Sequence, residues 1–446
     1  MNFQAAYIPV GVGTFHMESA DKAMQESIDT LKAIDPEVAV PEEKLLTLDL
    51  LRKYLAGLSP DLLVFQNLTF ANSAYMSEVM HAFPDVPLVI WTLREPVIDG
   101  GRLRLNSLTG AYSAANLVRA FTDRKFVYIY GAATEEKVKT TLAHAVSAAR
   151  LRKEMQSLTI SAVGHTPEGF GFGRALDQDL LKTFGVRLSS IEARELIHTA
   201  ESYSEEEIRP YLEKACKATV ALDQIPEKNQ LGFARLYKAY SDYVTKNHIG
   251  ALASRCWPDF FTSFGTPVCM VLAMLNDMGV AAACEADTYG ALSMWCGMKL
   301  SHQAVFFGDP VSLDEEKNTV TFWHCGTAAC SLAREDTGAR VGVHCNRKIG
   351  PTLEFGTKPS KDAVIFRIGR KADGTFRFLI AKGSCLDMPQ QFYGTSSVIQ
   401  LQTSAEDFVK ETVQDGWEPH YVVIYEDTAE ELKMLGDMLG IEVKEY

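Results

Sequence analysis

Hydrophobic residues in the first part of the chain form short runs, separated by segments in which they recur every three or four positions. Runs rich in Val, Ile, Leu and aromatic residues lie at 5–12, 61–68, 86–93 and 125–131. The segments between them, such as EEKLLTLDLLRKYLAGL and YSAANLVRAFTDR, have the spacing of amphipathic helices. Strands that alternate with helices need crossover connections, which are typical of parallel sheets. Residues 1–157 are therefore predicted to form a doubly wound α/β domain.

The same pattern returns after a long charged helix predicted at 134–158. LTISAVGHTPEGF has the character of a strand followed by a Gly-rich turn, and RALDQDLLKTF that of a helix. Further along, GALASRCW and AAACE have the character of buried strands, with the helix TPVCMVLAMLNDMG between them. We expect a second Rossmann-like α/β domain with a parallel sheet over residues 158–303.

From residue 304 onward the pattern changes to strands joined by turns. AVFFGDPVSL, NTVTFWHCG, DAVIFRIGR, TFRFLIA and SSVIQLQT are apolar runs separated by turn signals such as ADGT. Only two clear helices are expected, around 405–413 and 427–439. Residues 304–446 are predicted to form a mainly antiparallel β-barrel domain. The predicted fold class is therefore α/β, with two parallel-sheet domains followed by a barrel.

The amino-acid composition and net charge indicate which kinds of binding partner are not expected. Of the 446 residues, 47% are hydrophobic and 23% are charged, and the net charge is −13. Nucleic acids and anionic membranes are bound by clustered Lys and Arg, so neither is expected as a partner. No apolar run approaches the roughly 18–20 residues of a membrane helix, and the start of the chain lacks the features of a signal peptide. A cytoplasmic location is the expectation.

The apolar segment CEADTYGALSMWCGMKLSHQAVFFGDP contains carboxylates that need a partner, because an unpaired buried carboxylate is costly. Glu285 follows the strand AAAC, and Asp309 follows the apolar run AVFFG at a predicted strand end. His324 follows a third apolar run, and His420 stands at the start of another strand. Two carboxylates and two imidazoles suit Mn²⁺, or another divalent ion such as Mg²⁺ or Co²⁺. The sequence predicts a metal site built from these four residues.

Several segments resemble the L-fucose isomerase and L-arabinose isomerase superfamily. They are REPVIDGGRLRLNSLTGAY, the stretch from CWPDFF to CEADTYGALSMW, FFGDP, WHCG and the ending from PHYVVIYED to GIEV. The resemblance implies that Glu285 and Asp309 are metal ligands and also the acid and base of catalysis, and that His420 is a ligand. His324 matches a ligand of the arabinose branch. The implied activity is metal-dependent interconversion of an aldose and a ketose through an enediol.

Further residues are predicted to bind the sugar. His165 and Phe170 belong to the Gly-rich loop after the first strand of the second domain, and Trp257 lies in a segment that carries the resemblance. His16 is expected to reach the site of a neighbouring subunit, because the resembled enzymes are trimers or hexamers with composite sites. Arg102 or Arg347 would suit an anionic substituent on the sugar.

The substrate is predicted to be a deoxy-hexose, a pentose or a sulfo-sugar such as sulfoquinovose. Some isomerases that act on sulfoquinovose resemble this superfamily. Two alternatives remain open on the sequence alone. One is a non-catalytic sugar-binding or regulatory protein on the same scaffold, and the other is a metal-dependent hydrolase that uses the same ligands.

Overall fold

The computed structural model describes residues 2–446, which form two compact units. The first unit comprises the residues up to Glu154 together with Glu430–Gly440. The second comprises Met155–Ala429 and Ile441–Tyr446. Within residues 2–446, no helix combines the length and the hydropathy that are needed to cross a membrane.

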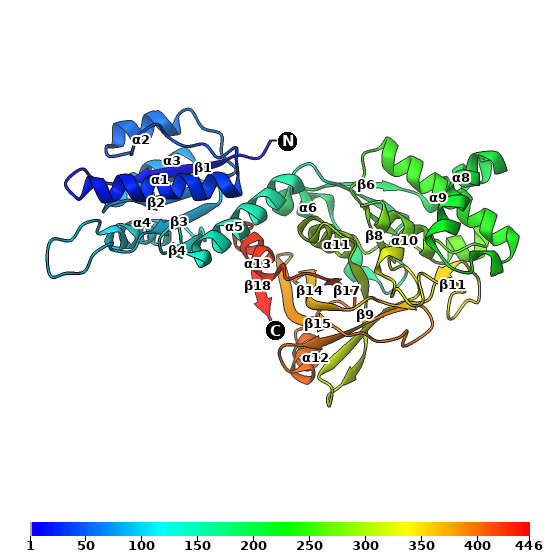
Figure 1. Cartoon of the computed structure of the whole chain (residues 1–446). Helices are drawn as coiled ribbons and strands as arrows, with labels where there is room; N and C mark the ends of the chain where they lie inside the picture. Colours follow the sequence, from blue (N-terminus) through cyan, green and yellow to red (C-terminus); the bar gives the residue numbers. More distant parts are fainter. Residues whose placement is uncertain (1) are drawn as a thin grey trace. The chain divides into compact units, whose positions relative to one another are not determined.

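The centre of the first unit is a parallel four-stranded sheet in the order β1-β2-β3-β4 (Figure 1). β1, β2 and β3 are buried along their whole length, and their sequences are mostly apolar, although β2 ends in the buried polar residues Gln66 and Asn67. The elements of this unit are β1 (Ala5–Val10), α1 (Met17–Ile34), α2 (Leu48–Leu55), β2 (Leu62–Asn67), α3 (Ser73–Ala82), β3 (Leu88–Thr92), α4 (Ser107–Phe121), β4 (Val127–Tyr130), α5 (Glu136–Met155) and α13 (Ala429–Met438).

The second unit begins with another parallel sheet, in the order β6-β5-β7-β8. Its elements are β5 (Thr159–Val163), the 3-10 helix η1 (Gly171–Gly173), α6 (Asp177–Phe184), β6 (Arg187–Ile191), α7 (Ala193–Ser202), α8 (Glu205–Ala218), the 3-10 helix η2 (Leu222–Gln224), α9 (Glu227–Lys246), β7 (Ala251–Ser254), the π-helix η3 (Asp259–Phe264), α10 (Cys269–Asp277), β8 (Ala281–Cys284) and α11 (Thr288–Ser301). Because all four strands are parallel, the loops that follow them meet at one edge of the sheet.

A closed antiparallel barrel follows in the same unit. Its strands pair in the order β16-β10-β9-β17-β14-β15, and β15 pairs with β16 to close the ring. The elements are β9 (Phe306–Asp314), β10 (Thr319–His324), the 3-10 helix η4 (Cys330–Leu332), β11 (Val341–Gly342), β12 (Thr352–Leu353), β13 (Phe355–Gly356), β14 (Ser360–Arg370), β15 (Phe376–Cys385), β16 (Thr395–Leu401), α12 (Ala405–Gln414), β17 (Tyr421–Ile424) and β18 (Glu442–Glu445).

Helix α11 joins the two halves of the second unit. It packs against β7 and β8 of the parallel sheet and against β14 and β17 of the barrel. Figure 1 shows it between these two sets of strands. Nearly all of its residues are buried, as a helix that is apolar on every side requires. The N-terminus of α11 therefore lies where the sheet and the barrel meet.

The predicted fold class is confirmed: two parallel-sheet α/β parts are followed by an antiparallel barrel. The division into three domains stays a prediction. One local prediction was wrong, because Asp309 does not end its strand but lies inside β9. Pro310 does not stop this strand, since Val311 forms a bulge between the pairs Pro310–Phe322 and Ser312–Thr321.

Candidate active site

Glu285 is the first residue after β8, at the carboxyl edge of the parallel sheet. Glu285 and Ala286 both have a left-handed backbone, with φ of 58° and 56°. This conformation is uncommon for residues other than glycine and persists where the surrounding structure fixes it. Here the N–H of Ala286 donates to the carbonyl of Ser254, the last residue of β7, at 3.0 Å. The turn therefore holds Glu285 in a defined position at the sheet edge.

Asp287 caps the N-terminus of α11 and forms a buried ion pair with Arg367 of β14. Its Oδ1 accepts a hydrogen bond from the N–H of Gly290 at 2.8 Å. Arg367 donates from Nη1 to Oδ2 at 2.6 Å and from Nη2 to Oδ1 at 3.1 Å. Both side chains are 0% exposed. This bidentate ion pair holds the N-terminus of α11 against strand β14 of the barrel.

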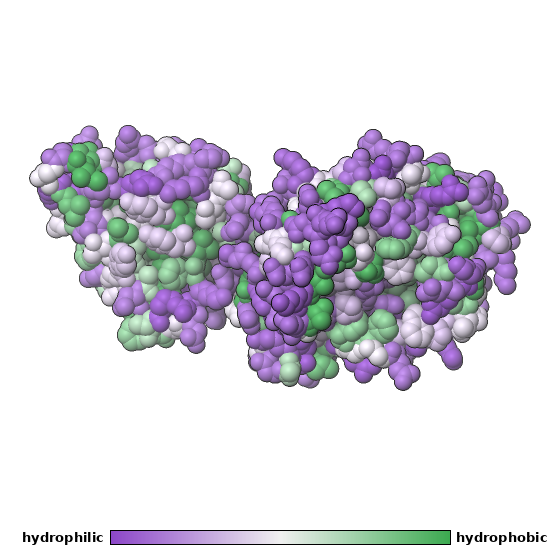
Figure 2. Space-filling view, turned by 90° about the horizontal axis from the view of Figure 1, so that it is seen from below, coloured by the Kyte–Doolittle hydropathy of each residue, from purple (hydrophilic) through white to green (hydrophobic). Residues whose placement is uncertain are grey.

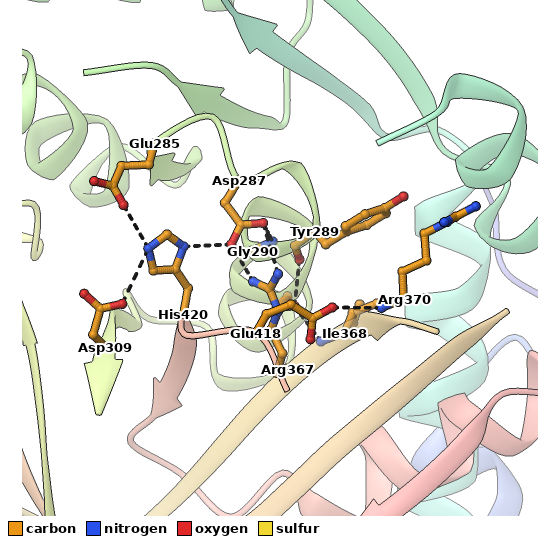
Figure 3. Close-up of polar contacts among 11 residues, drawn as sticks. Glu285, Asp287, Tyr289, Gly290, Asp309, Arg367, Ile368, Arg370, Glu418 and His420 are labelled. Carbon is orange, nitrogen blue, oxygen red and sulfur yellow. Dashed lines mark hydrogen bonds and ion pairs between the residues drawn. The ribbon is translucent and has the colours of Figure 1, made fainter. Parts of the chain in front are cut away.

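His420, directly before β17, lies among three carboxylates (Figure 3). Its Nδ1 is 2.9 Å from Asp287 Oδ2. Its Nε2 is 3.0 Å from Glu285 Oε2 and 3.5 Å from Asp309 Oδ1. In Figure 3, Glu285 and Asp309 stand on one side of the imidazole and Asp287 on the other. His420 is buried, whereas the side chains of Glu285 and Asp309 are 19% and 31% exposed, so these two carboxylates are in contact with solvent.

These contacts set the protonation of the buried groups in the metal-free protein. Burial would lower the pKa of His420, but its hydrogen bonds to Asp287 and Glu285 outweigh this and raise the pKa to about 10. Burial would raise the pKa of Asp287, but Arg367 and His420 hold it well below its usual range. For Asp309 burial prevails, and the pKa is raised. Asp287 is therefore ionised, and its negative charge faces Nδ1 of His420.

His324, the last residue of β10, borders this cluster. One of its ring nitrogens lies within 4.8 Å of ligand atoms from Glu285 and His420. Its Nδ1 accepts a hydrogen bond from the backbone N–H of Cys325 at 3.0 Å, so a neutral His324 carries its proton on Nε2. Bonding of Nε2 to a metal would displace that proton. The role of His324 as a fourth ligand stays a prediction.

Aromatic rings extend from the cluster along one side. The ring of Phe172 lies edge-on to His420, with 5.3 Å between centroids. Phe170 is 5.5 Å from Phe172 and 6.5 Å from Trp257. We call Phe172, Phe170 and Trp257 the aromatic wall. Two of its members, Phe170 and Trp257, were predicted from the sequence to bind the sugar.

The remaining predicted sugar-binding residues lie in both units. His165 is exposed in the loop after β5, and Arg347 is exposed in the loop between β11 and β12. His16 and Arg102 belong to the first unit, where His16 caps α1 and Arg102 donates to the carbonyl of Thr14. Contact of these four residues with the sugar stays a prediction.

Sequence reasoning did not identify the roles of Asp287, Arg367 and Phe172. Two features of the sequence point to the members of the ion pair. Asp287 stands directly before a helix, where Asp is a favoured cap, and Arg367 is a lone charge within the apolar run AVIFRIG. A charge inside a buried strand requires a partner, but the sequence does not say which carboxylate supplies it. Phe172 has no comparable signal, because Gly-rich loops often contain an aromatic residue.

The arrangement around His420 fits a divalent cation. Two carboxylate oxygens converge on Nε2, and a third carboxylate holds Nδ1, which is the usual outer partner of a metal-binding histidine. Other groups of potential ligands within residues 2–446 contain thiols: Cys269 with Cys325 and His344, and Cys284 with His324 and Cys325. Thiolates suit softer ions than Mn²⁺, so the oxygen-rich group around His420 is the candidate manganese site.

The barrel that contributes His324 and His420 to this cluster is similar in sequence to L-fucose isomerase. A sequence model described as the L-fucose isomerase C-terminal domain matches residues 324–446. This match covers most of the barrel and includes His324 and His420.

Full-length relatives define the family more narrowly. A sulfoquinovose isomerase of Clostridium sp. (strain MSTE9) is 57% identical over 444 residues, covering 100% of this chain and 99% of its own length. A sulfoquinovose isomerase of Priestia megaterium is 36% identical over 449 residues, with 100% and 99% covered. One of Alkalicoccus urumqiensis is 35% identical over 442 residues, with 98% of each chain covered. The chain belongs to the sulfoquinovose isomerase family within the L-fucose isomerase-like superfamily.

Proposed function

We propose that this protein is a metal-dependent aldose–ketose isomerase that converts sulfoquinovose into the corresponding ketose. The observation that carries the proposal is the convergence of Glu285 and Asp309 on His420, in a chain whose full-length relatives are sulfoquinovose isomerases. Glu285, Asp309 and His420 would hold the ion. A divalent cation at this place supplies Lewis-acid polarisation of the sugar's carbonyl group.

The reaction moves one proton between two neighbouring carbons of the open-chain sugar through an enediol. Glu285 and Asp309 approach the same point from two different elements, the turn after β8 and strand β9. One carboxylate would take the proton from the carbon beside the carbonyl, and the other would give a proton to the carbonyl carbon, while the hydroxyl proton passes from the second oxygen to the former carbonyl oxygen. Asp287 keeps the imidazole of His420 oriented, because it holds Nδ1 from the opposite side.

Proton NMR in D₂O tests both the reaction and its route. Protein incubated with Mn²⁺ and sulfoquinovose is expected to form the ketose, with solvent deuterium on the carbon that receives the proton. Addition of a chelator is expected to stop the conversion. Absence of any ketose would refute the proposed function, and ketose without deuterium would refute the transfer of the proton through two different carboxylates. Cleavage of a bond by water would instead select the hydrolase alternative.

Binding of Mn²⁺ is expected to become stronger as the pH rises across neutrality. In the metal-free protein the pKa of His420 is about 10, so the imidazole carries a proton at neutral pH. A histidine must be neutral to bind a metal, so the ion displaces this proton and the affinity rises about tenfold per pH unit below that pKa. Calorimetry in buffers of different ionisation enthalpy measures the proton release. The same affinity at all pH values, with no proton released, would show that His420 is not a ligand.

We also propose that the protein assembles into a homo-oligomer, as the resemblance implies. Large hydrophobic side chains are exposed in the first unit on α4 and the loop before it: Ile98 (92%), Leu103 (49%), Leu108 (43%) and Tyr112 (73%). The face drawn in Figure 2 shows hydrophobic patches between hydrophilic residues. Such patches are typical of contact surfaces. Analytical ultracentrifugation is expected to find a trimer or hexamer, and a monomer at all concentrations would contradict this.

A further inference from the structure

The proposed substrate has two ends with different requirements. The carbonyl end must reach Glu285 and Asp309, and the far end carries a sulfonate that is anionic at any physiological pH. An anion in a protein site is best held by a cation that has no carboxylate of its own, because an existing ion pair would have to be broken first. A residue suited to hold the sulfonate is therefore a cation of the second unit that has no carboxylate partner and is connected to the cluster by a continuous surface.

Two arginines near the cluster are already engaged. Arg367 is fully buried and paired with Asp287. Arg255, directly after β7, contacts Asp259 at 3.2 Å and donates to the carbonyl of Trp257. Neither is free to take up an anion from the substrate.

Arg347 differs from both. Its guanidinium lies over the rings of Trp257 and Phe261, at 5.3 Å and 4.9 Å from the ring centroids. Within residues 2–446 it makes no ion pair with a carboxylate, and its side chain is exposed. Aromatic rings hold a guanidinium in place through the ring face and leave its N–H edge free for a ligand. Arg347 is thus an oriented cation without an anionic partner.

His344 holds the loop that carries Arg347 in place. His344 is 4% exposed and lies edge-on to Phe261, with 4.9 Å between ring centroids. Its Nδ1 accepts the backbone N–H groups of Asn346 and Arg347, at 3.3 Å and 3.4 Å. Its own carbonyl accepts the N–H of Lys348 at 2.9 Å. These contacts close the turn, so the position of Arg347 is built into the fold.

The aromatic wall connects Arg347 to the candidate metal ligands. Trp257, which supports Arg347, contacts Phe170, and Phe170 contacts Phe172, which lies edge-on to His420. Aromatic faces pack well against the C–H groups of a sugar. A sugar that lay along this wall with its carbonyl end at Glu285 and Asp309 would have its other end directed toward Trp257 and Arg347.

We propose that Arg347, held on Trp257 and Phe261, binds the sulfonate of the substrate and makes the site select sulfonated over unsulfonated sugars. This inference rests on the proposed function. It names the residue that recognises the anionic end of the sugar.

The test compares two sugars that differ only in the anionic group, sulfoquinovose and 6-deoxyglucose. In Arg347→Gln the ratio of kcat/KM for sulfoquinovose to kcat/KM for 6-deoxyglucose is expected to fall by roughly 10- to 100-fold, because a charge-assisted hydrogen bond is lost. The loss should appear mainly as a higher KM for sulfoquinovose. Arg347→Lys is expected to recover part of the selectivity, since it restores the charge but not the forked geometry.

Arg209→Gln is the matched control, because Arg209 is an exposed arginine on α8 and the variant has the same change of charge. Its selectivity ratio is expected to equal that of the wild type. An unchanged ratio in Arg347→Gln, or an equal loss with both sugars, would overturn the inference. Failure of the proposed function looks different, because the wild-type protein itself would then not isomerise sulfoquinovose.

Discussion

Glu285→Gln and Asp309→Asn are each expected to reduce kcat for isomerisation by about 10²- to 10⁴-fold, the usual contribution of a general acid or base. Both substitutions keep the size of the side chain and remove its ability to exchange a proton. The two carboxylates converge on His420 Nε2, at 3.0 Å and 3.5 Å, and each has its own proton-transfer step in the proposed reaction, so loss of either is expected to slow turnover. Steady-state kinetics at saturating Mn²⁺ measure the effect.

A matched control and a binding measurement separate catalysis from metal loading. Glu213 is exposed on α8, so Glu213→Gln is expected to have the activity of the wild type. Electron paramagnetic resonance of Mn²⁺ reports how much ion each variant binds, and kinetics are compared only where the site is filled. Wild-type turnover in either Glu285→Gln or Asp309→Asn would show that the acid and base have been assigned to the wrong residues.

Arg367→Met is expected to lower the free energy of unfolding of the second unit by about 3–5 kcal/mol, the usual cost of breaking one side of a buried ion pair. Arg367 and Asp287 are both 0% exposed, so the carboxylate of Asp287 would remain in the interior without its main partner. The variant is also expected to bind Mn²⁺ more weakly, because Asp287 orients His420. Denaturant unfolding of the metal-free protein measures the stability.

The double variant Asp287→Asn/Arg367→Met provides the internal control. It removes both charges, so its loss of stability is expected to be smaller than the sum of the two single losses. Lys317→Met breaks an exposed pair with Asp314 and is expected to change stability by less than about 1 kcal/mol. If Arg367→Met were as stable as the wild type, the ion pair would not hold α11 against the barrel.

The sequence was sufficient for the fold class because its apolar periodicity is strong. Fully buried strands such as β1 and β8 appear as continuous apolar runs, and the change to turn-separated strands after α11 marks the barrel. The prediction of a strand end was wrong where tertiary structure overrides the local sequence pattern. Asp309 before Pro310 has the character of a strand end, yet a bulge at Val311 lets β9 continue.

The candidate site was only partly predictable for a related reason. Glu285 stands out because its small apolar neighbours offer no partner, and the carboxyl edge of a parallel sheet is a common place for ligands. The pairing of Asp287 with Arg367, separated by 80 residues, depends on how α11 packs on the barrel. Nothing in local sequence encodes that contact. The same holds for Phe172 beside His420, since a loop residue has no periodicity that would place it.

A crystal structure of the Mn²⁺-loaded protein, with anomalous data at the manganese absorption edge, tests the central claim most directly. We expect an anomalous peak coordinated by Glu285, Asp309 and His420 in the second unit. A peak at the thiol-rich group of Cys269, Cys325 and His344, or anywhere outside reach of Glu285 and Asp309, would contradict it.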